Sequence, residues 1–122
     1  DWVEPKDLAH TSRATPLAIA AVAEALREAG IEAGAMSREE LRGIGVMVGS
    51  GGGAVEFTEE QYRLFHTGKW RQCSVYVVPT STIGTLASEI SMKFGFRGAS
   101  HVISTGCTSS TDAIGYAYRN IR

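Results

Sequence analysis

The chain has 122 residues, a length that fits one domain, and its 12 basic and 13 acidic side chains give a formal net charge of −1. This balance excludes the strongly basic footprint of a nucleic-acid-binding protein, and no apolar run approaches the roughly 18 residues that a membrane span needs. Hydrophobic residues make up 43% and charged residues 20% of the chain, which favours a globular domain over disorder.

The cysteine and histidine content excludes further classes of protein. Two cysteines, Cys73 and Cys107, are too few for the disulfide framework of a small secreted protein. No basic region followed by an apolar stretch marks a signal peptide, so a cytoplasmic, reducing setting is expected. The three histidines, His10, His66 and His101, form no metal-ligand spacing with Cys73, so no metal site is predicted.

The first half of the chain predicts one long helix and one short strand. The helix covers 16–29, with Pro16 in its first turn and Gly30 at its end. Its shared face is expected to consist of Ala18, Ala21, Val22 and Ala25. Residues 31–43 are interpreted as a polar connection with a short capped turn from Ser37 to Glu40. Residues 44–48 are predicted to be an apolar strand, and residues 55–68 a helical excursion.

The glycine-rich turn at 49–53 has two interpretations. The spacing Gly49-x-Gly51-x-x-Ala54 after a strand meets a loose dinucleotide-binding pattern. That pattern needs an acidic residue about 20 positions further on, where Lys69 to Cys73 provide none. We therefore interpret the segment as a flexible or tight turn over an active site.

The second half continues the alternation of helix and strand. A short strand is predicted at 75–78, stopped by Pro79, followed by a helix over 82–94 and a strand at 100–104. The face of that helix is predicted to be Ile83, Leu86, Ala87, Ile90 and Phe94, with Gly95 and Gly98 at its end. The alternation indicates an α/β fold with a parallel sheet. Three short strands are few for an independent sheet, so part of the fold is expected to lie elsewhere.

The last segment is predicted to be a helix that begins at Cys107. Its expected face is Ala113, Ile114, Ala117, Tyr118 and Ile121. No Gly, Asn or Pro follows to end it, and the chain begins with Asp1 rather than Met. We expect the sequence to be a piece of a longer protein.

Cys107 is the strongest candidate for chemistry. A strand runs to Gly106 and a helix then begins, which is the arrangement of a nucleophile elbow. Unpaired N–H groups and a partial positive charge at the helix N-terminus favour the thiolate form. The backbone N–H of Cys107 is expected to help hold an oxyanion, and Thr108, Ser109 and Ser110 to cap the turn.

Each candidate residue could instead have a structural role or simply be solvated. Cys107 could instead be a buried structural cysteine, but its place between a strand-ending glycine and a helix favours a nucleophile. Cys73 is interpreted as a packing residue and His66 as a solvated histidine at the end of a loop. Lys6 and Arg13 are interpreted mainly as solvated cations, with docking of an acidic partner as the alternative.

Taken together, these segments resemble a β-ketoacyl synthase of the thiolase-like superfamily. The resemblance covers essentially all 122 residues. It is carried by Ser12-Arg13-Ala14-Thr15 before an Ala-rich helix, by Gly45-Val-Met-Val-Gly-Ser-Gly51, and above all by Ser104-Thr-Gly-Cys-Thr-Ser-Ser-Thr-Asp-Ala-Ile-Gly-Tyr-Ala117. The Thr-Gly-Cys-Thr-Ser form is closest to the ketosynthase subunit of type II aromatic polyketide synthases. The pair Ser110-Thr111 departs from the Gly-Leu usual in those subunits.

The resemblance implies a fold and an activity. The chain would be a portion of the N-terminal half of a β-ketoacyl synthase domain, with layered helices around a mixed or parallel sheet that is incomplete without the following half. Cys107 would accept an acyl chain from an acyl carrier protein for decarboxylative Claisen condensation. The phosphopantetheine would arrive on the carrier protein, so no resident cofactor is expected. Two histidines, a lysine and a Gly-Phe-Gly-Gly loop would follow the cysteine. None is present here, so these residues alone are expected not to elongate a chain.

The resemblance also implies partners. The family dimerises through the strand before the cysteine, which here is Ala99, Ser100, His101, Val102, Ile103 and Ser104. The partner would be a chain-length factor or a second ketosynthase subunit, and residues 55–72 would lie near it and the acyl tunnel. The alternatives are a fatty-acid β-ketoacyl synthase, a thiolase-like acyl-transfer relative, and a non-catalytic chain-length subunit. Cys107 argues against the last of these, because such subunits lose the nucleophile.

Overall fold

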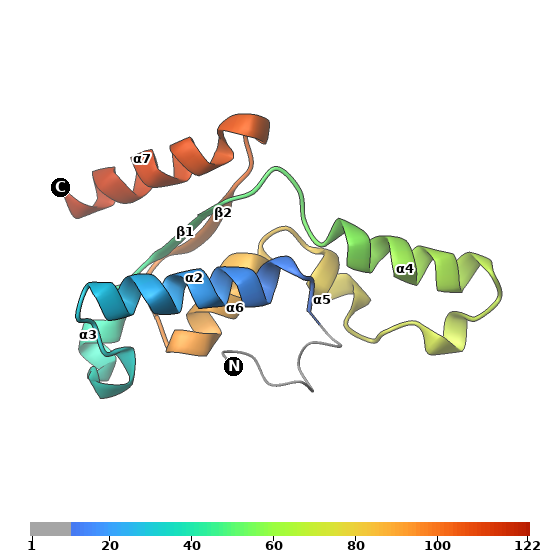
Figure 1. The fold of residues 1–122 in the computed structure, drawn as a ribbon, viewed down its shortest axis with the longest axis horizontal. Helices are drawn as coiled ribbons and strands as arrows, with labels where there is room; N and C mark the ends of the chain where they lie inside the picture. Colours follow the sequence, from blue (N-terminus) through green and yellow to red (C-terminus); the bar gives the residue numbers. More distant parts are fainter. Residues whose placement is uncertain (1–10) are drawn as a thin grey trace.

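A computed structural model of the chain describes residues 11–122. Short helices and two short strands follow one another along this part of the chain (Figure 1). In order they are α2 (Ala14–Glu28), η1 (Ala33–Ala35), α3 (Arg38–Arg42), β1 (Val46–Gly49), α4 (Val55–His66), η2 (Trp70–Gln72), α5 (Val77–Ser81), α6 (Thr85–Phe94), β2 (Ser100–Ile103), η3 (Gly106–Thr108) and α7 (Ser109–Ile121).

The two strands form the centre of the fold. β1 and β2 pair in parallel, with Val46 opposite Ser100 and Gly49 opposite Ile103. Helix α7 packs on one side of this pair, and α6 packs on the other with α2 beyond it (Figure 1). The connection between the strands runs through α4, α5 and α6, as a parallel crossover requires. The result is a layered arrangement of helices around a small parallel sheet.

The core lies between the sheet and the helices α2 and α6. Five buried residues form its centre: Ile19 from α2, Val46 from β1, Ala87 and Ile90 from α6, and Phe96 after α6. Ala87 is fully buried, and its small side chain lets α6 lie close to its neighbours. Val48 and Val102 from the strands pack against the same cluster, so the core binds the sheet to α6.

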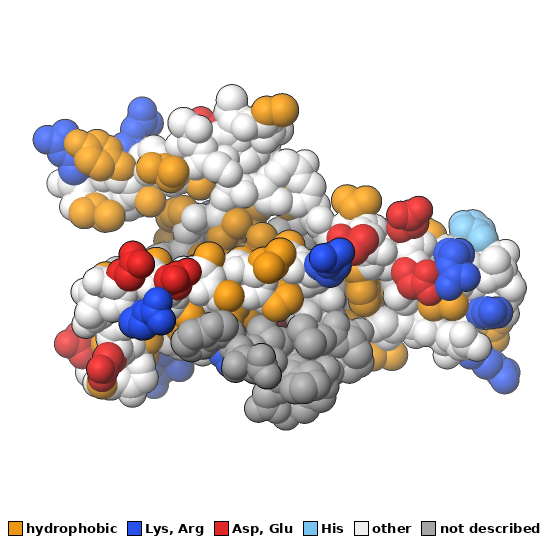
Figure 2. Space-filling view, in the orientation of Figure 1, with side chains coloured by type: hydrophobic (Ala, Val, Ile, Leu, Met, Phe, Trp, Pro, Cys, Tyr) orange, Lys and Arg blue, Asp and Glu red, His pale blue; other side chains and the backbone are white. Residues whose placement is uncertain are grey.

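An apolar groove borders the core beside β1. It has a volume of about 520 Å³ and lies between α2, β1 and the end of α7. Val22, Met47, Val48 and Ile121 are among the side chains that line it. Figure 2 shows apolar side chains gathered between α7 and α2 on the face in view. Helix α4 extends away from this groove, together with α5 (Figure 1).

Most of the predicted elements are confirmed, with shifted ends. The helix expected at 16–29 begins at Ala14, and the one expected at 82–94 begins at Thr85. Gly30 and Gly95 both adopt positive φ at the helix ends, as the sequence predicted. The turn at Ser37 is a full capping box with Glu40, in which hydrogen bonds with the Ser37 side chain and backbone N–H hold the pKa of the Glu40 carboxyl below its ordinary value.

The strand predicted at 75–78 is wrong. The Tyr76 N–H donates to the Ser74 hydroxyl at 3.1 Å, and the Val77 N–H donates to the Ser74 carbonyl at 3.1 Å, so the chain turns instead of extending. Helix α5 then begins at Val77. Pro79 lies in its first turn, where the missing N–H costs no helical hydrogen bond. The described residues therefore form two strands and not the three expected.

Two predicted helix faces are also partly wrong. In α2 the buried positions are Thr15, Ile19 and Ala23, whereas Ala21 and Ala25 are exposed. In α7 only Ala113 of the predicted face is buried, and three of its apolar members are largely exposed: Ile114, Tyr118 and Ile121. Because α7 packs mainly on β1, it buries a narrow stripe and leaves the rest of its apolar surface uncovered.

The core assignment predicts the effect of truncating Ile90, which is 2% exposed. We expect Ile90→Ala to lower the free energy of unfolding by about 2–5 kcal/mol, because it removes buried methyl groups and leaves a cavity. Urea denaturation of the complete protein measures this change. Met92→Ala on the same helix is the matched control, since Met92 is 69% exposed. Equal losses for the two variants would contradict the assigned core.

Candidate active site

Cys107 lies on an exposed turn between β2 and α7. β2 ends at Ile103, and the single 3-10 turn η3 spans Gly106–Thr108 before α7 begins at Ser109. Gly106 adopts a φ of 66°, in the left-handed region that only glycine enters easily. The Cys107 thiol is free and exposed. The expectation that Cys107 itself opens the α-helix is therefore corrected: Cys107 lies in the 3-10 turn that precedes α7.

Ser109 fixes the backbone of this turn. Its side chain is buried at 3% exposure and takes part in two hydrogen bonds. The hydroxyl accepts from the Thr105 N–H at 3.0 Å and donates to the Gly106 carbonyl at 2.6 Å. The Thr108 hydroxyl donates to the Thr105 carbonyl at 3.0 Å. The predicted capping by Thr108, Ser109 and Ser110 is wrong in this form: the Thr108 and Ser109 side chains bond to the turn itself, and the N-terminus of α7 has no side-chain cap.

The glycine-rich segment at 49–53 lies against this turn. A Cβ atom placed on Gly49 would lie 2.3 Å from the Ser109 carbonyl oxygen and 2.5 Å from the Ser110 Cα. A Cβ atom on Gly51 would lie 3.5 Å from the Gly106 carbonyl oxygen. The Ser50 N–H donates to the Ile103 carbonyl at 3.1 Å, which extends the pairing of β1 with β2 by one bond. The segment is a tight turn beside the cysteine, as the sequence indicated.

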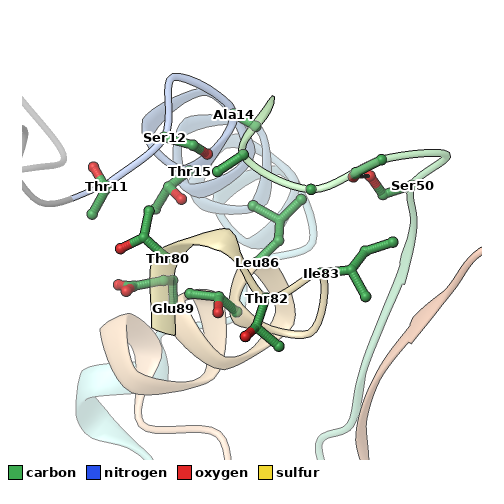
Figure 3. Close-up of a pocket in the computed structure, with 14 residues that line it drawn as sticks. Thr11, Ser12, Ala14, Thr15, Ser50, Thr80, Thr82, Ile83, Leu86 and Glu89 are labelled. Atoms are coloured by element: carbon green, nitrogen blue, oxygen red, sulfur yellow. Dashed lines mark hydrogen bonds between the residues drawn. The ribbon is translucent and has the colours of Figure 1, made fainter. Parts of the chain in front are cut away.

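A small polar pocket lies on another side of the glycine-rich segment (Figure 3). Its volume is about 40 Å³, and hydroxyl groups of Thr15, Ser50, Thr80 and Thr82 help to line it. Figure 3 shows these side chains around the start of α2 and the α5–α6 connection, together with Glu89. No residue from 104 to 112 lines this pocket, so it does not serve the cysteine.

The sequence analysis did not select Asp112, which the structure brings to the turn. Its carboxylate accepts a hydrogen bond from the Thr105 hydroxyl, and the Thr108 hydroxyl lies 3.2 Å from the same oxygen. Thr108 and Asp112 are four residues apart, the spacing that places side chains on one face of a helix. That spacing is the signal in the sequence that could have identified Asp112.

The other candidate residues lie away from this turn. The Cys73 thiol donates to the Gln61 carbonyl at 3.6 Å and is half-buried, which agrees with a packing role. His66 stacks on Tyr62 in α4, with 6.4 Å between ring centroids. Arg13 is exposed at the start of α2, where its backbone N–H donates to the Glu56 carboxylate at 2.8 Å. Lys6 and His10 lie outside the described residues.

The predicted interface strand is accessible along most of its length. Ala99, Ser100, His101 and Ser104 are exposed, whereas Val102 and Ile103 are half-buried. In the part of the chain that the structure describes, β2 pairs only with β1, which leaves its other edge open. Over the same residues, no group of three His, Cys, Asp or Glu side chains could hold a metal ion, and no helix has the length and apolar character to cross a membrane.

All 122 residues match the family model described as β-ketoacyl synthase, N-terminal domain. The chain belongs to the β-ketoacyl synthase family. A crystal structure of a β-ketoacyl synthase from Burkholderia phymatum superposes with a TM-score of 0.78 at 28% identity, covering 99% of this chain and 29% of that one. The likeness confirms the expected thiolase-like α/β fold. The Cys107 turn thus belongs to a β-ketoacyl synthase domain.

The chain is similar to proteins of two kinds, polyketide synthase subunits and a 3-oxoacyl-[acyl-carrier-protein] synthase. The tetracenomycin polyketide synthase ketoacyl synthase alpha subunit of Streptomyces glaucescens is 32% identical over 100% of this chain and 29% of its own length. A putative polyketide β-ketoacyl synthase of Streptomyces halstedii is 35% identical over 89% of this chain and 26% of its own length. The 3-oxoacyl-[acyl-carrier-protein] synthase 2 of Vibrio cholerae is 35% identical over 84% of this chain and 24% of its own length. The chain thus spans 24% to 29% of the length of these relatives.

The contact at Gly49 predicts a sharp difference between two glycines of one turn. We expect Gly49→Ala to separate β1 from the start of α7 and lower the free energy of unfolding by about 1–3 kcal/mol or more, since the added methyl group meets backbone. Gly52→Ala is the control, because its methyl group would find only the Val55 side chain at 3.7 Å. Thermal denaturation of both variants measures the difference. A Gly49→Ala protein as stable as the Gly52→Ala protein would contradict the close approach.

Proposed function

We propose that the chain is the part of a β-ketoacyl synthase that carries the acyl-accepting nucleophile, Cys107. One observation carries the proposal: the exposed thiol stands on a glycine turn between β2 and α7, in a chain that matches this family over its full length. The enzyme would elongate acyl chains by decarboxylative Claisen condensation on acyl carrier protein thioesters.

The turn suits the first half of that reaction. The Cys107 thiolate attacks the carbonyl carbon of the incoming thioester, and a tetrahedral oxyanion forms. The backbone N–H of Cys107, near the N-terminus of α7, would stabilise this oxyanion. The carbon–sulfur bond to the carrier breaks, and the carrier's thiol leaves with the proton that Cys107 gave up. The phosphopantetheine is thus part of the substrate, and no resident cofactor takes part.

The second half of the reaction needs groups that these 122 residues do not supply. Decarboxylation of the extender unit would give a carbanion that attacks the Cys107 thioester. The two histidines and the lysine that support this step in the family follow the cysteine. We therefore propose that acyl loading is the contribution of this segment, and that the segment on its own does not elongate a chain.

We propose type II polyketide biosynthesis as the setting. The Thr-Gly-Cys-Thr-Ser form around Cys107 favours it, as does the similarity to polyketide synthase subunits from two Streptomyces species. The similarity to a 3-oxoacyl-[acyl-carrier-protein] synthase supports fatty-acid elongation as the second candidate. A non-catalytic chain-length subunit is disfavoured by the exposed thiol. A thiol nucleophile must stay reduced, which agrees with a cytoplasmic setting.

The proposed partners are an acyl carrier protein, the remainder of the ketosynthase chain, and a chain-length factor or second ketosynthase subunit. The open edge of β2, from Ala99 to Ser104, supports pairing with the second subunit, because unpaired N–H and C=O groups there can extend a sheet. The exposed Arg13 supports docking of an acidic carrier protein, and Lys6 remains a candidate for the same role.

Replacement of the two cysteines tests the proposal. We expect Cys107→Ala in the complete protein to abolish acyl transfer from an acyl carrier protein thioester, because it removes the exposed thiol that is proposed to accept the acyl chain. Cys73→Ala is the matched control and should load at nearly the normal rate. Peptide mass spectrometry after a brief incubation locates the acyl group.

Two results would contradict the assignment. Normal loading of the Cys107→Ala protein would eliminate Cys107 as the nucleophile. Loss of loading in a folded Cys73→Ala protein would mean that the other thiol takes the acyl chain. Circular dichroism establishes that each variant is folded before its loading is compared.

A further inference from the structure

We infer that Asp112 is a positioning residue for Cys107, acting through the side chains of Thr105 and Thr108 on either side of the thiol. This inference rests on the proposed function, because it assigns a task to Asp112 only if Cys107 is the nucleophile. Asp112 itself belongs to the first turn of α7 and is half-buried.

The hydrogen bonds of Asp112 span the cysteine. Thr105 precedes Gly106 and Cys107, and its hydroxyl donates to Asp112 Oδ2. Thr108 follows Cys107, and its hydroxyl lies 3.2 Å from the same Oδ2, 3.0 Å from the Thr105 carbonyl oxygen and 3.1 Å from Thr105 Oγ1. The Thr105 hydroxyl thus connects the residue before the turn to α7 through Asp112, and the single proton of the Thr108 hydroxyl has three acceptors within reach, one of which is Asp112 Oδ2.

The charge of Asp112 determines the direction of these bonds. An ionised carboxylate only accepts, and each threonine hydroxyl has one proton to donate. Thr105 must point its proton at Asp112, which turns its oxygen lone pairs toward the Thr108 hydroxyl. Hydrogen bonds to an ionised acceptor are about twice as strong as neutral ones. The carboxylate thus fixes the orientation of the Thr105 hydroxyl, which in turn offers its oxygen as an acceptor to Thr108.

Side-chain hydrogen bonds from the first turn of α7 hold the cysteine turn, whose place is set by the close approach of Gly49 to Ser109. Residues 104–108 are all exposed, and a Cβ atom on Gly106 would meet nothing within 4 Å. Ser109 fastens the Thr105 N–H and the Gly106 carbonyl, which are backbone groups. Asp112 accepts a hydrogen bond from the Thr105 side chain and lies within hydrogen-bond distance of the Thr108 hydroxyl, and Ser109 bonds to neither side chain. Without Asp112 the turn would keep its backbone connection to α7 and lose its side-chain connection.

A competing role for Asp112 is stabilisation of α7 alone. An acidic side chain in the first turn interacts favourably with the partial positive charge of the helix N-terminus. That role would affect unfolding but would not depend on the two threonines. The two roles are separated by measuring acyl transfer and stability on the same variants.

The test compares four variants of the complete protein with the unaltered protein: Asp112→Ala, Asp112→Asn, Thr105→Val and Thr111→Val. Asp112→Asn keeps an oxygen that accepts hydrogen bonds at the same place. Thr105→Val removes the bridging hydroxyl with little change of shape. Thr111→Val makes the same change at an exposed position of the same helix turn, for which no hydrogen bond is found. Acetyl transfer from acetyl–acyl carrier protein is followed in a single turnover, and melting temperature is recorded for each variant.

We expect Asp112→Ala and Thr105→Val to slow maximal acetyl transfer by about tenfold to a hundredfold, because a shift of about 1 Å in a reacting group costs roughly a hundredfold. The carrier concentration for half-maximal rate should stay within about twofold, since carrier docking is not altered. Asp112→Asn should recover most of the rate, and Thr111→Val should match the unaltered protein. Alkylation of Cys107 by iodoacetamide, quantified by peptide mapping, should change little, because a small reagent needs no fixed direction of approach.

Several results would overturn the inference. They are normal transfer rates in Thr105→Val, a rate loss in Asp112→Asn as large as in Asp112→Ala, and equal losses of transfer and alkylation. If Asp112→Ala does not fold, Thr105→Val and Asp112→Asn still decide the question. Cys107→Ala distinguishes the two hypotheses: continued loading in that variant refutes the proposed function, whereas its inactivity beside a fully active Thr105→Val protein refutes only the role of Asp112.

Discussion

The place of the cysteine turn depends on the contact between Gly49, at the end of β1, and the backbone of Ser109 and Ser110, at the start of α7. β1 pairs in parallel with β2, and Gly49 lies opposite Ile103. The end of β1 is therefore fixed beside the end of the strand that leads to Gly106. The absence of a side chain at residue 49 lets the first turn of α7 lie directly on that strand end. Hydrogen bonds from Ser109 and Asp112 then act on a turn whose position the sheet has already determined.

Much of this arrangement could be predicted from local sequence signals. The helices α2 and α6 follow from apolar spacing and helix-ending glycines, and α7 from apolar spacing alone, because these features act within a few residues. The glycine turn that carries Cys107 between β2 and α7 followed from the order of strand, Gly106 and Cys107. Of the two forms of turn that the sequence allowed at 49–53, flexible or tight, the structure has the tight one, beside Cys107. The parallel sheet followed from alternation of helix and strand alone.

The predictions that were wrong have a different cause. At these positions contacts with other parts of the fold, rather than the local sequence, determine the structure. Residues 75–78 have strand-forming side chains, yet the bonds to Ser74 turn the chain into α5. The predicted face of α7 counted every apolar residue, whereas β1 covers only a narrow stripe of that helix. Asp112 was missed because an acid in a first helical turn usually serves the helix dipole, and only the fold shows Thr105 reaching it. The exact capping bonds of Ser109 likewise needed the backbone geometry of η3.

The pairing of β1 with β2 has a consequence for the order in which parts of the chain fold. During synthesis β1 leaves the ribosome long before β2, with α4, α5 and α6 between them. Pairings between distant segments form slowly, because the closing of a long loop precedes the contacts that reward it. Cys107 emerges after both strands, and its turn is assembled only once they are joined. The backbone around Cys107 therefore takes its final form only after two segments far apart in the chain have paired.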